Sequence, residues 1–273
     1  MLNKHSASPE HGGTIVKSEE LLTAVAAIAR RAGERIMAVY AGDFEVSGKR
    51  DGSPVTLADQ QAEELIVEAL SRLDPATPIV AEELVAGGRI PDVSGGRFWL
   101  VDPLDGTKEF VSRNGEFTVN IALIEHGEPV AGVVLAPALD DGAGRLYAGA
   151  SGHGAWVEDG HGRRPIHCRS VPAAGLTVLA SRSHGDPAAL ERLLAGRRVA
   201  QLINAGSSLK LCLVAEGQAD LYPRQGRTME WDIAAGHAVL SAAGGSVRRL
   251  DDDQPLRYGK PGFENPHFVA AGL

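Results

Sequence analysis

Apolar residues recur at helical spacing in two stretches near the start of the chain. The first stretch runs from Leu21 to Tyr40 and has Ser18 in position to cap a helix. The second follows a turn-forming segment, residues 49–54, and begins at Thr56. Its expected buried stripe consists of Leu65, Ile66, Ala69, Leu70 and Leu73. We therefore expect two amphipathic helices packed on a larger body.

Short apolar runs separated by Gly, Pro or charged turns predict strands beyond the second helix. In the first half these strands are 79–81, 98–101, 118–124, 130–135 and 146–150. The second half alternates: strands are expected at 178–180, near 199 and at 220–222, with helices from 187, from 207 to Gly217 and from 232 to about 243. This order predicts a layered α/β (α+β) protein with a flexible tail at 1–17, an N-terminal lobe at 18–160 and a C-terminal lobe at 161–273.

Composition narrows the partners that the protein can bind. The 273 residues include 35 acidic and 27 basic side chains, a net charge of −8 that repels a nucleic acid polymer. A smaller anion would need a local binding site, formed by a metal ion, a helix N-terminus or a few basic residues. The two cysteines fit a reduced intracellular compartment, and we expect a soluble, cytoplasmic protein because no signal peptide or long apolar run occurs.

The segment from Phe98 to Thr107 carries the most specific chemical signal. An apolar run leads directly into Asp102-Pro103-Leu104-Asp105-Gly106-Thr107, where Pro and Gly favour a tight turn. Such a turn can direct the two carboxylates and the Leu104 carbonyl toward one point, which suits magnesium. The alternative is an Asx-type turn with a threonine cap.

Three other acidic positions could join this cluster. Glu82 and Glu83 follow a predicted strand, and the sequence does not decide which of them points inward. Asp59 falls on the apolar face of its helix, yet it also stands at capping-box spacing from Thr56, so capping and catalysis are both open. Asp232, at the start of the last helix, is typical of an N-cap when taken alone.

Several candidate anion ligands occur in the second half of the chain. Residues 204–210 open a helix with glycine, hydroxyls and a lysine, and Ser207 and Lys210 there could bind a phosphate. Arg224 and His184 are further candidates, although either could be an ordinary surface residue.

Together these motifs resemble the lithium-sensitive, magnesium-dependent phosphatases of the inositol monophosphatase and fructose-1,6-bisphosphatase superfamily. The resemblance spans about residues 20–270 and rests on residues 53–56 with Asp59, 82–83, 99–110 and 231–237. Lys108-Glu109-Phe110 and the segment 114–120 are most similar to the CysQ-type 3'(2'),5'-bisphosphate nucleotidases. Glu230 departs from that pattern and is similar to a sugar-contacting glutamate of inositol monophosphatases.

The resemblance implies a layered αβαβα sandwich that binds two or three Mg²⁺ ions and is inhibited by Li⁺. It further implies metal ligation by Glu82, Asp102, the Leu104 carbonyl, Asp105 and Asp232, water activation by Asp59 and Thr107, and substrate contacts from Gly106, Thr107, His184, Ser207, Lys210 and Arg224. Two carboxylates about 5 Å apart repel by roughly 3 kcal/mol at an effective dielectric near 20, so such a cluster attracts divalent cations.

The substrate implied by the resemblance is 3'-phosphoadenosine 5'-phosphate, with its sulfated precursor as a second substrate, in sulfate assimilation. Inositol monophosphate hydrolysis is the first alternative, and a non-catalytic metal- or nucleotide-binding regulator is the second. The intact acidic set weighs against the regulator. The resemblance leaves open whether the protein is a monomer or a homodimer, and whether it associates with the cytoplasmic face of the inner membrane.

Overall fold

A seven-stranded sheet forms the body of the computed structural model, which describes residues 12–44, 46–48, 54–181 and 187–273. Apart from the parallel pair β3 and β4, neighbouring strands in it are antiparallel, so most of the sheet is a meander of consecutive strands. In sheet order the strands are β3 (Ile79–Ala81), β4 (Arg97–Asp105), β5 (Thr118–Glu125), β6 (Glu128–Ala136), β7 (Arg145–Ala150), β8 (Gly154–Asp159) and β9 (Gly162–Ile166).

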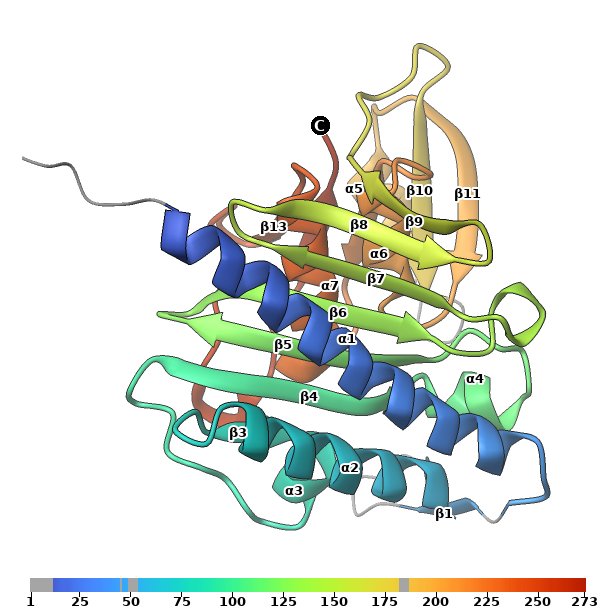
Figure 1. Ribbon diagram of the computed structural model, residues 1–273. Coiled ribbons are helices and arrows are strands. Elements are labelled where there is room, and N and C mark those ends of the chain that lie inside the picture. Colours follow the sequence, from blue (N-terminus) through green and yellow to red (C-terminus); the bar gives the residue numbers. More distant parts are fainter. Residues whose placement is uncertain (1–11, 45, 49–53, 182–186) are drawn as a thin grey trace, which may run out of the picture.

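Two long helices, α1 (Gly12–Tyr40) and α2 (Leu57–Leu73), cover one face of this sheet (Figure 1). Helix α1 begins earlier than expected, so residues 12–17 are helical rather than part of a tail, and Ser18 lies inside the helix. Residues 1–11 lie outside the described part of the chain. The predicted stripe of α2 is confirmed at Ile66 and Leu70 but wrong at Leu73, which is exposed. The buried face extends instead toward the start of the helix, through Ala62 and Ala58.

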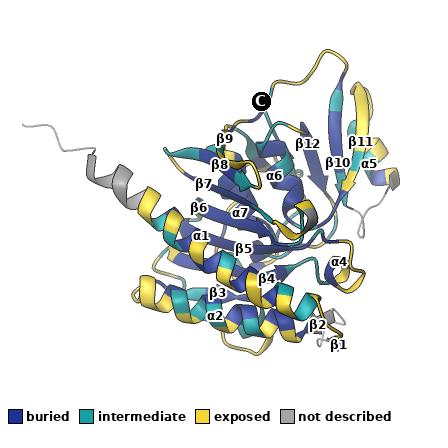
Figure 2. Ribbon diagram, turned by 45° about the vertical axis from the view of Figure 1, so that its right-hand side comes forward, coloured by how far each residue is buried: buried dark blue, intermediate teal, exposed yellow. Residues whose placement is uncertain are grey.

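The opposite face of the sheet is covered by α6 (Leu209–Ala215) and α7 (Glu230–Ala242). Beyond them lies a five-stranded sheet, and α5 (Pro187–Leu194) lies at its outer side beside β11 (Figure 2). The strand order of this sheet is β11 (Val199–Ala205), β10 (Leu176–Ser181), β12 (Leu221–Arg224), β14 (Phe268–Ala271) and β13 (Ser246–Arg249). The layers therefore alternate between helices and sheets, which confirms the expected αβαβα sandwich.

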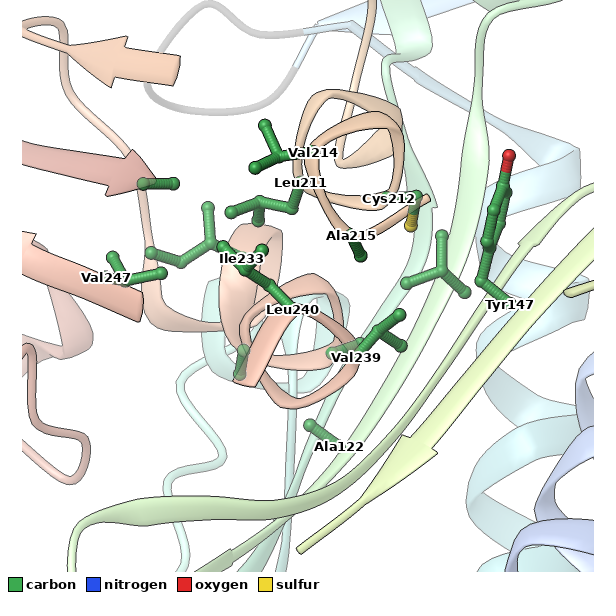
Figure 3. Close-up of a cluster of buried hydrophobic side chains, with 14 of the residues drawn as sticks. Ala122, Tyr147, Leu211, Cys212, Val214, Ala215, Ile233, Val239, Leu240 and Val247 are labelled. Carbon is green, nitrogen blue, oxygen red and sulfur yellow. The ribbon is translucent and has the colours of Figure 1, made fainter. Parts of the chain in front are cut away.

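Glycines allow α7 to lie directly on the strands below it. A Cβ added at Gly132 of β6 would lie 2.4 Å from the Ala235 carbonyl oxygen, and one at Gly149 of β7 would lie 2.9 Å from the Val239 Cα. On its other side α7 meets α6, whose Leu211 packs against Gly236 (Figure 3). The middle of α7 is thus held by close packing on both sides.

Several short elements were not anticipated from the sequence, including β8, β9, β13 and β14. The others are β1 (Val46–Gly48), β2 (Pro54–Thr56), α3 (Glu82–Ala86), α4 (Thr107–Val111) and the 3-10 turns Asp140–Gly142 and Pro261–Phe263. The division into lobes at residue 160 stays a prediction, although β9 lies beyond it and still belongs to the seven-stranded sheet. Within the described residues, no helix combines the length and the apolar character needed to cross a membrane.

Candidate active site

A bulge near the end of β4 places two aspartates on one face of the sheet. Asp102 pairs with Asn120 of β5, and Asp105 pairs with Thr118, so three steps along β4 match two steps along β5. Because residues two apart on a strand share a face, the extra residue brings Asp102 and Asp105 onto the same face. The expected turn is confirmed in part: β4 continues to Asp105, but its pairing is interrupted at Pro103, and the Leu104 N–H donates to Asp102 Oδ1 at 3.0 Å, as in an Asx-type turn.

Gly106 ends the strand and starts the short helix α4. Its φ of 89° lies in the left-handed region, which glycine adopts without strain. The next residue, Thr107, thereby comes to the first turn of α4, where its hydroxyl lies 3.3 Å from the Leu104 carbonyl oxygen and 3.4 Å from Asp59 Oδ1.

Asp59 caps α2, which confirms one of the two roles that the sequence left open, and its catalytic role stays a prediction. Its Oδ2 accepts hydrogen bonds from the Thr56 N–H and the Thr56 hydroxyl, both at 2.7 Å, which completes a capping box on α2. Its other oxygen faces Thr107. The cap orients the carboxylate, since one oxygen is held by the helix start while the second reaches the α4 loop.

Glu82, rather than Glu83, lies in the wall of the main cavity. The Glu83 N–H donates to Glu63 Oε2 at 2.7 Å, so this part of α3 is tied to α2. Glu63 was missed in the sequence, although it lies one helical turn after Asp59 on the same buried face. Burial raises the pKa of Glu63 to about 7, with Glu83 and Glu82 adding to the increase.

These elements surround a cavity of about 730 Å³, within the usual range for a small-molecule site. Of the residues expected at the site, Glu82, Asp105, Gly106, Thr107, Ser207, Lys210, Arg224 and Asp232 line it. Asp59, Asp102 and Leu104 do not line it; they lie in the shell behind Thr107 and Asp105. His184 lies outside the described residues.

Three carboxylates in the cavity wall, those of Glu82, Asp105 and Asp232, form an acidic group. Burial raises the pKa of Asp232 well above its ordinary value, and Asp105 and Glu82 raise it further through repulsion. Burial likewise raises the pKa of Asp105 to about 6, against the opposing effects of Lys210 and of the Ser208 N–H that donates to Asp105 Oδ2 at 2.6 Å. Asp232 also caps α7, because its Oδ2 accepts the Met229 N–H at 2.8 Å.

The cavity wall also contains two cations, Lys210 and Arg224, which form a basic group. Lys210 is buried, and its Nζ donates to the carbonyls of Ala205 at 3.1 Å and Ser207 at 2.5 Å. Burial lowers the pKa of Lys210 to about 8, with Arg224 contributing, while Asp105 and the glutamates Glu109 and Glu116 counteract the decrease. The residues predicted to bind a phosphate thus line one cavity, but much of the hydrogen-bonding capacity of Lys210 is used on the loop before α6.

Glu230 does not lie in the cavity wall. Its carboxylate is fully buried and accepts the N–H groups of Gly259 at 2.7 Å and Lys260 at 2.9 Å. Lys260 Nζ also donates to it at 2.6 Å. Glu230 therefore holds the segment around residue 260 against the start of α7.

The chemistry of the acidic group fits a hard divalent cation. Its donors are carboxylate oxygens that are buried and repel one another, and the described cavity wall contains no His or Cys. In the described part of the chain, however, no three His, Cys, Asp or Glu side chains form a ready-made group that could hold a metal ion. The donor set suits a hard divalent cation, and its members share one cavity without forming a closed ligand shell.

The sandwich and its carboxylate-lined cavity are those of a known class of phosphatases. The chain belongs to the inositol monophosphatase family, which it matches over residues 17–270.

Within that family the chain is similar to proteins named for one activity. It is 48% identical over 251 residues to the 3'(2'),5'-bisphosphate nucleotidase CysQ of Escherichia coli strain K12, an alignment that covers 91% of this chain and 98% of the relative. The crystal structure of CysQ from Bacteroides thetaiotaomicron superposes with a TM-score of 0.80 at 37% identity and covers 94% of this chain and 98% of that one. An inositol monophosphatase from Anabaena superposes with a TM-score of 0.72 at 27% identity, with coverages of 93% and 90%.

Proposed function

We propose that the protein is a magnesium-dependent 3'(2'),5'-bisphosphate nucleotidase that removes the 3'-phosphate of 3'-phosphoadenosine 5'-phosphate. The observation that carries this proposal is a cavity wall that combines three carboxylates, those of Glu82, Asp105 and Asp232, with two cations, Lys210 and Arg224. A substrate with two phosphates matches such a cavity, because one phosphate can meet bound cations while the other meets the basic side chains. The similarity to CysQ proteins supports the same substrate and a place in sulfur assimilation.

Residues in and around the acidic group would perform the hydrolysis. Magnesium ions bound by Glu82, Asp102, the Leu104 carbonyl, Asp105 and Asp232 would supply an activated water and neutralise charge on the leaving oxygen. Thr107 and Asp59 would orient that water and accept its proton, since their facing oxygens are 3.4 Å apart. Gly106 lets the chain approach the phosphate closely at the start of α4.

The basic group, Lys210 and Arg224, would bind the 5'-phosphate together with Ser207. His184 remains a proposed contact. The buried thiols of Cys168 and Cys212 are both free, in keeping with our proposal of a cytoplasmic enzyme.

Inositol monophosphate hydrolysis is the weaker proposal on structural grounds. Its sequence support was Glu230, which binds backbone N–H groups and Lys260 away from the cavity wall. A carboxylate engaged in this way is not placed to contact the hydroxyls of a sugar or cyclitol.

The test is phosphate release in the presence of Mg²⁺ from 3'-phosphoadenosine 5'-phosphate, inositol 1-phosphate and fructose 1,6-bisphosphate, each with and without Li⁺. We expect the highest kcat/KM for the bisphosphonucleotide, loss of activity with EDTA and inhibition by Li⁺. A preference for inositol 1-phosphate would favour the first alternative. Binding of the nucleotide without release of phosphate from any of the three compounds would favour the regulator.

A further inference from the structure

The loop that leads into α6 has a conformation that must be held by its surroundings. Ser207 has a φ of 41°, in the left-handed region that non-glycine residues adopt at a cost of about 1 kcal/mol or more. The loop, residues 205–208, contributes Gly206, Ser207 and Ser208 to the cavity wall.

Three side chains from different parts of the chain hold this loop. The Gly206 N–H donates to Glu116 Oε2 at 2.7 Å, and the Ser208 N–H donates to Asp105 Oδ2 at 2.6 Å. Lys210 Nζ binds the two carbonyls on either side of Gly206, those of Ala205 and Ser207. The backbone polarity of the loop is thus satisfied by charged partners, which give stronger hydrogen bonds than neutral ones.

Glu116 also limits the position of the loop by direct packing. A Cβ added at Gly206 would lie 2.6 Å from the Glu116 carbonyl oxygen and 2.9 Å from its Cβ. A Cβ at Gly106, in the loop before α4, would lie 3.2 Å from the same oxygen. Glu116 therefore lies between the two loops that form neighbouring parts of the cavity wall.

We propose that Glu116 is a positioning residue that makes the enzyme selective for substrates with a second phosphate. This inference rests on the proposed function, in which the 205–208 loop and Lys210 face the phosphate that does not react. A bisphosphate has two anionic groups at a fixed separation, so its binding depends on where this loop lies relative to the acidic group. A monophosphate that uses only the acidic group depends less on the position of the loop.

The experiment compares 3'-phosphoadenosine 5'-phosphate with adenosine 3'-phosphate, which lacks only the second phosphate. In Glu116→Ala we expect KM for the bisphosphate to rise about tenfold, the effect of losing one charge-assisted hydrogen bond, with kcat nearly unchanged. KM for adenosine 3'-phosphate should stay within about twofold of the wild type, a shift too small to represent a lost hydrogen bond. Glu116→Gln should restore most of the selectivity, because its amide oxygen can accept the Gly206 N–H.

Gly206→Ala provides an independent variant that keeps the carboxylate but displaces the loop, and it should show the same selective defect. Glu68→Ala, at an exposed position of α2 where the side chain forms an ion pair with Arg72, is the matched control and should leave both substrates unaffected. Melting temperatures measured for all variants separate a selective defect from a general loss of folding.

Each outcome bears on a different claim. Equal losses for the two substrates in Glu116→Ala, or unchanged selectivity in both Glu116→Ala and Gly206→Ala, would overturn the role of Glu116 alone. A wild-type enzyme that does not prefer the bisphosphate would overturn the proposed function, and the selective role of Glu116 with it.

Discussion

Thr107 Oγ1 lies 3.4 Å from Asp59 Oδ1, and this contact connects the first turn of α4 to the first turn of α2. The other oxygen of the same carboxylate caps α2 by accepting two hydrogen bonds from Thr56. One side chain therefore fixes a helix start and presents an oxygen to the residue that lines the cavity.

Asp59→Asn should reduce kcat by about 10² to 10⁴, the usual contribution of a general base. The amide oxygen can still accept the Thr56 N–H, so the melting temperature should fall by only a few degrees. Steady-state kinetics and thermal unfolding measure the two effects separately. Thr56→Ser retains the cap and should keep nearly full activity; a variant Asp59→Asn with unchanged kcat would leave Asp59 as a cap only.

Asp232→Asn should inactivate the enzyme while stabilising its metal-free form. Asp232 is buried and is repelled by Asp105 and Glu82, so neutralising it removes an unfavourable interaction, and the Met229 N–H keeps an acceptor. We expect an increase of about 1 to 2 kcal/mol in the free energy of unfolding without magnesium. Added Mg²⁺ should raise the melting temperature of the wild type more than that of the variant. A metal-free variant less stable than the wild type would contradict this account.

His237 should make the protein lose stability as the pH falls below about 6.5. Burial, with help from Arg257, lowers the pKa of His237 to about 3, and its Nδ1 lies 2.8 Å from the Tyr258 hydroxyl. Between the folded-state pKa of about 3 and the unfolded-state pKa of about 6.5, the unfolded chain binds a proton on His237 that the folded chain does not bind. The contribution of the buried, neutral His237 to the free energy of unfolding is therefore complete above the upper value and decreases as the pH falls toward the lower one. Between about pH 7 and about pH 5 the loss should approach 2 kcal/mol.

Urea unfolding at a series of pH values measures this contribution. The curve for His237→Gln should be flatter than that of the wild type over the same interval, because glutamine does not titrate. Parallel curves would mean that other groups cause the acid sensitivity.

Gly132→Ala should destabilise the fold by about 1 to 3 kcal/mol through overpacking, since the added Cβ would lie 2.4 Å from the Ala235 carbonyl oxygen. The start of α7 would shift with it, so kcat should fall as well. Gly95→Ala is the control, because a Cβ there meets nothing within 4 Å. Equal unfolding midpoints for the two variants would show that α7 can move away from β6 without cost.

The sequence predicted those features whose signals lie within a few neighbouring residues. Strand 79–81 was predicted with its observed bounds, and the Thr56 cap was anticipated from its spacing to Asp59. The chemical signal in residues 102–107 also led to the cavity, because it combines several rare features within one turn's length.

The errors occur where distant segments decide the outcome. Pro103 and Gly106 were taken together as a turn, but pairing with β5 keeps residues up to 105 in the strand. Glu116 and Glu63 have no distinctive local pattern; their functions depend on Gly206 and Glu83, which lie far away in the chain. Leu73 fits the helical period but lies past the end of the surface that α2 covers, and its exposed fraction is 41%.

The extra residue in β4 makes the site sensitive to chain length. Deleting one residue between Asp102 and Asp105 would leave the two aspartates two apart and still on one face, but it would remove the bulge and the hydrogen bond from the Leu104 N–H to Asp102 Oδ1 that forms within it. Replacing Leu104 by another apolar residue would preserve the spacing and the carbonyl group. Loss of one residue between Asp102 and Asp105 should therefore be far more harmful than most substitutions at residues 103 and 104.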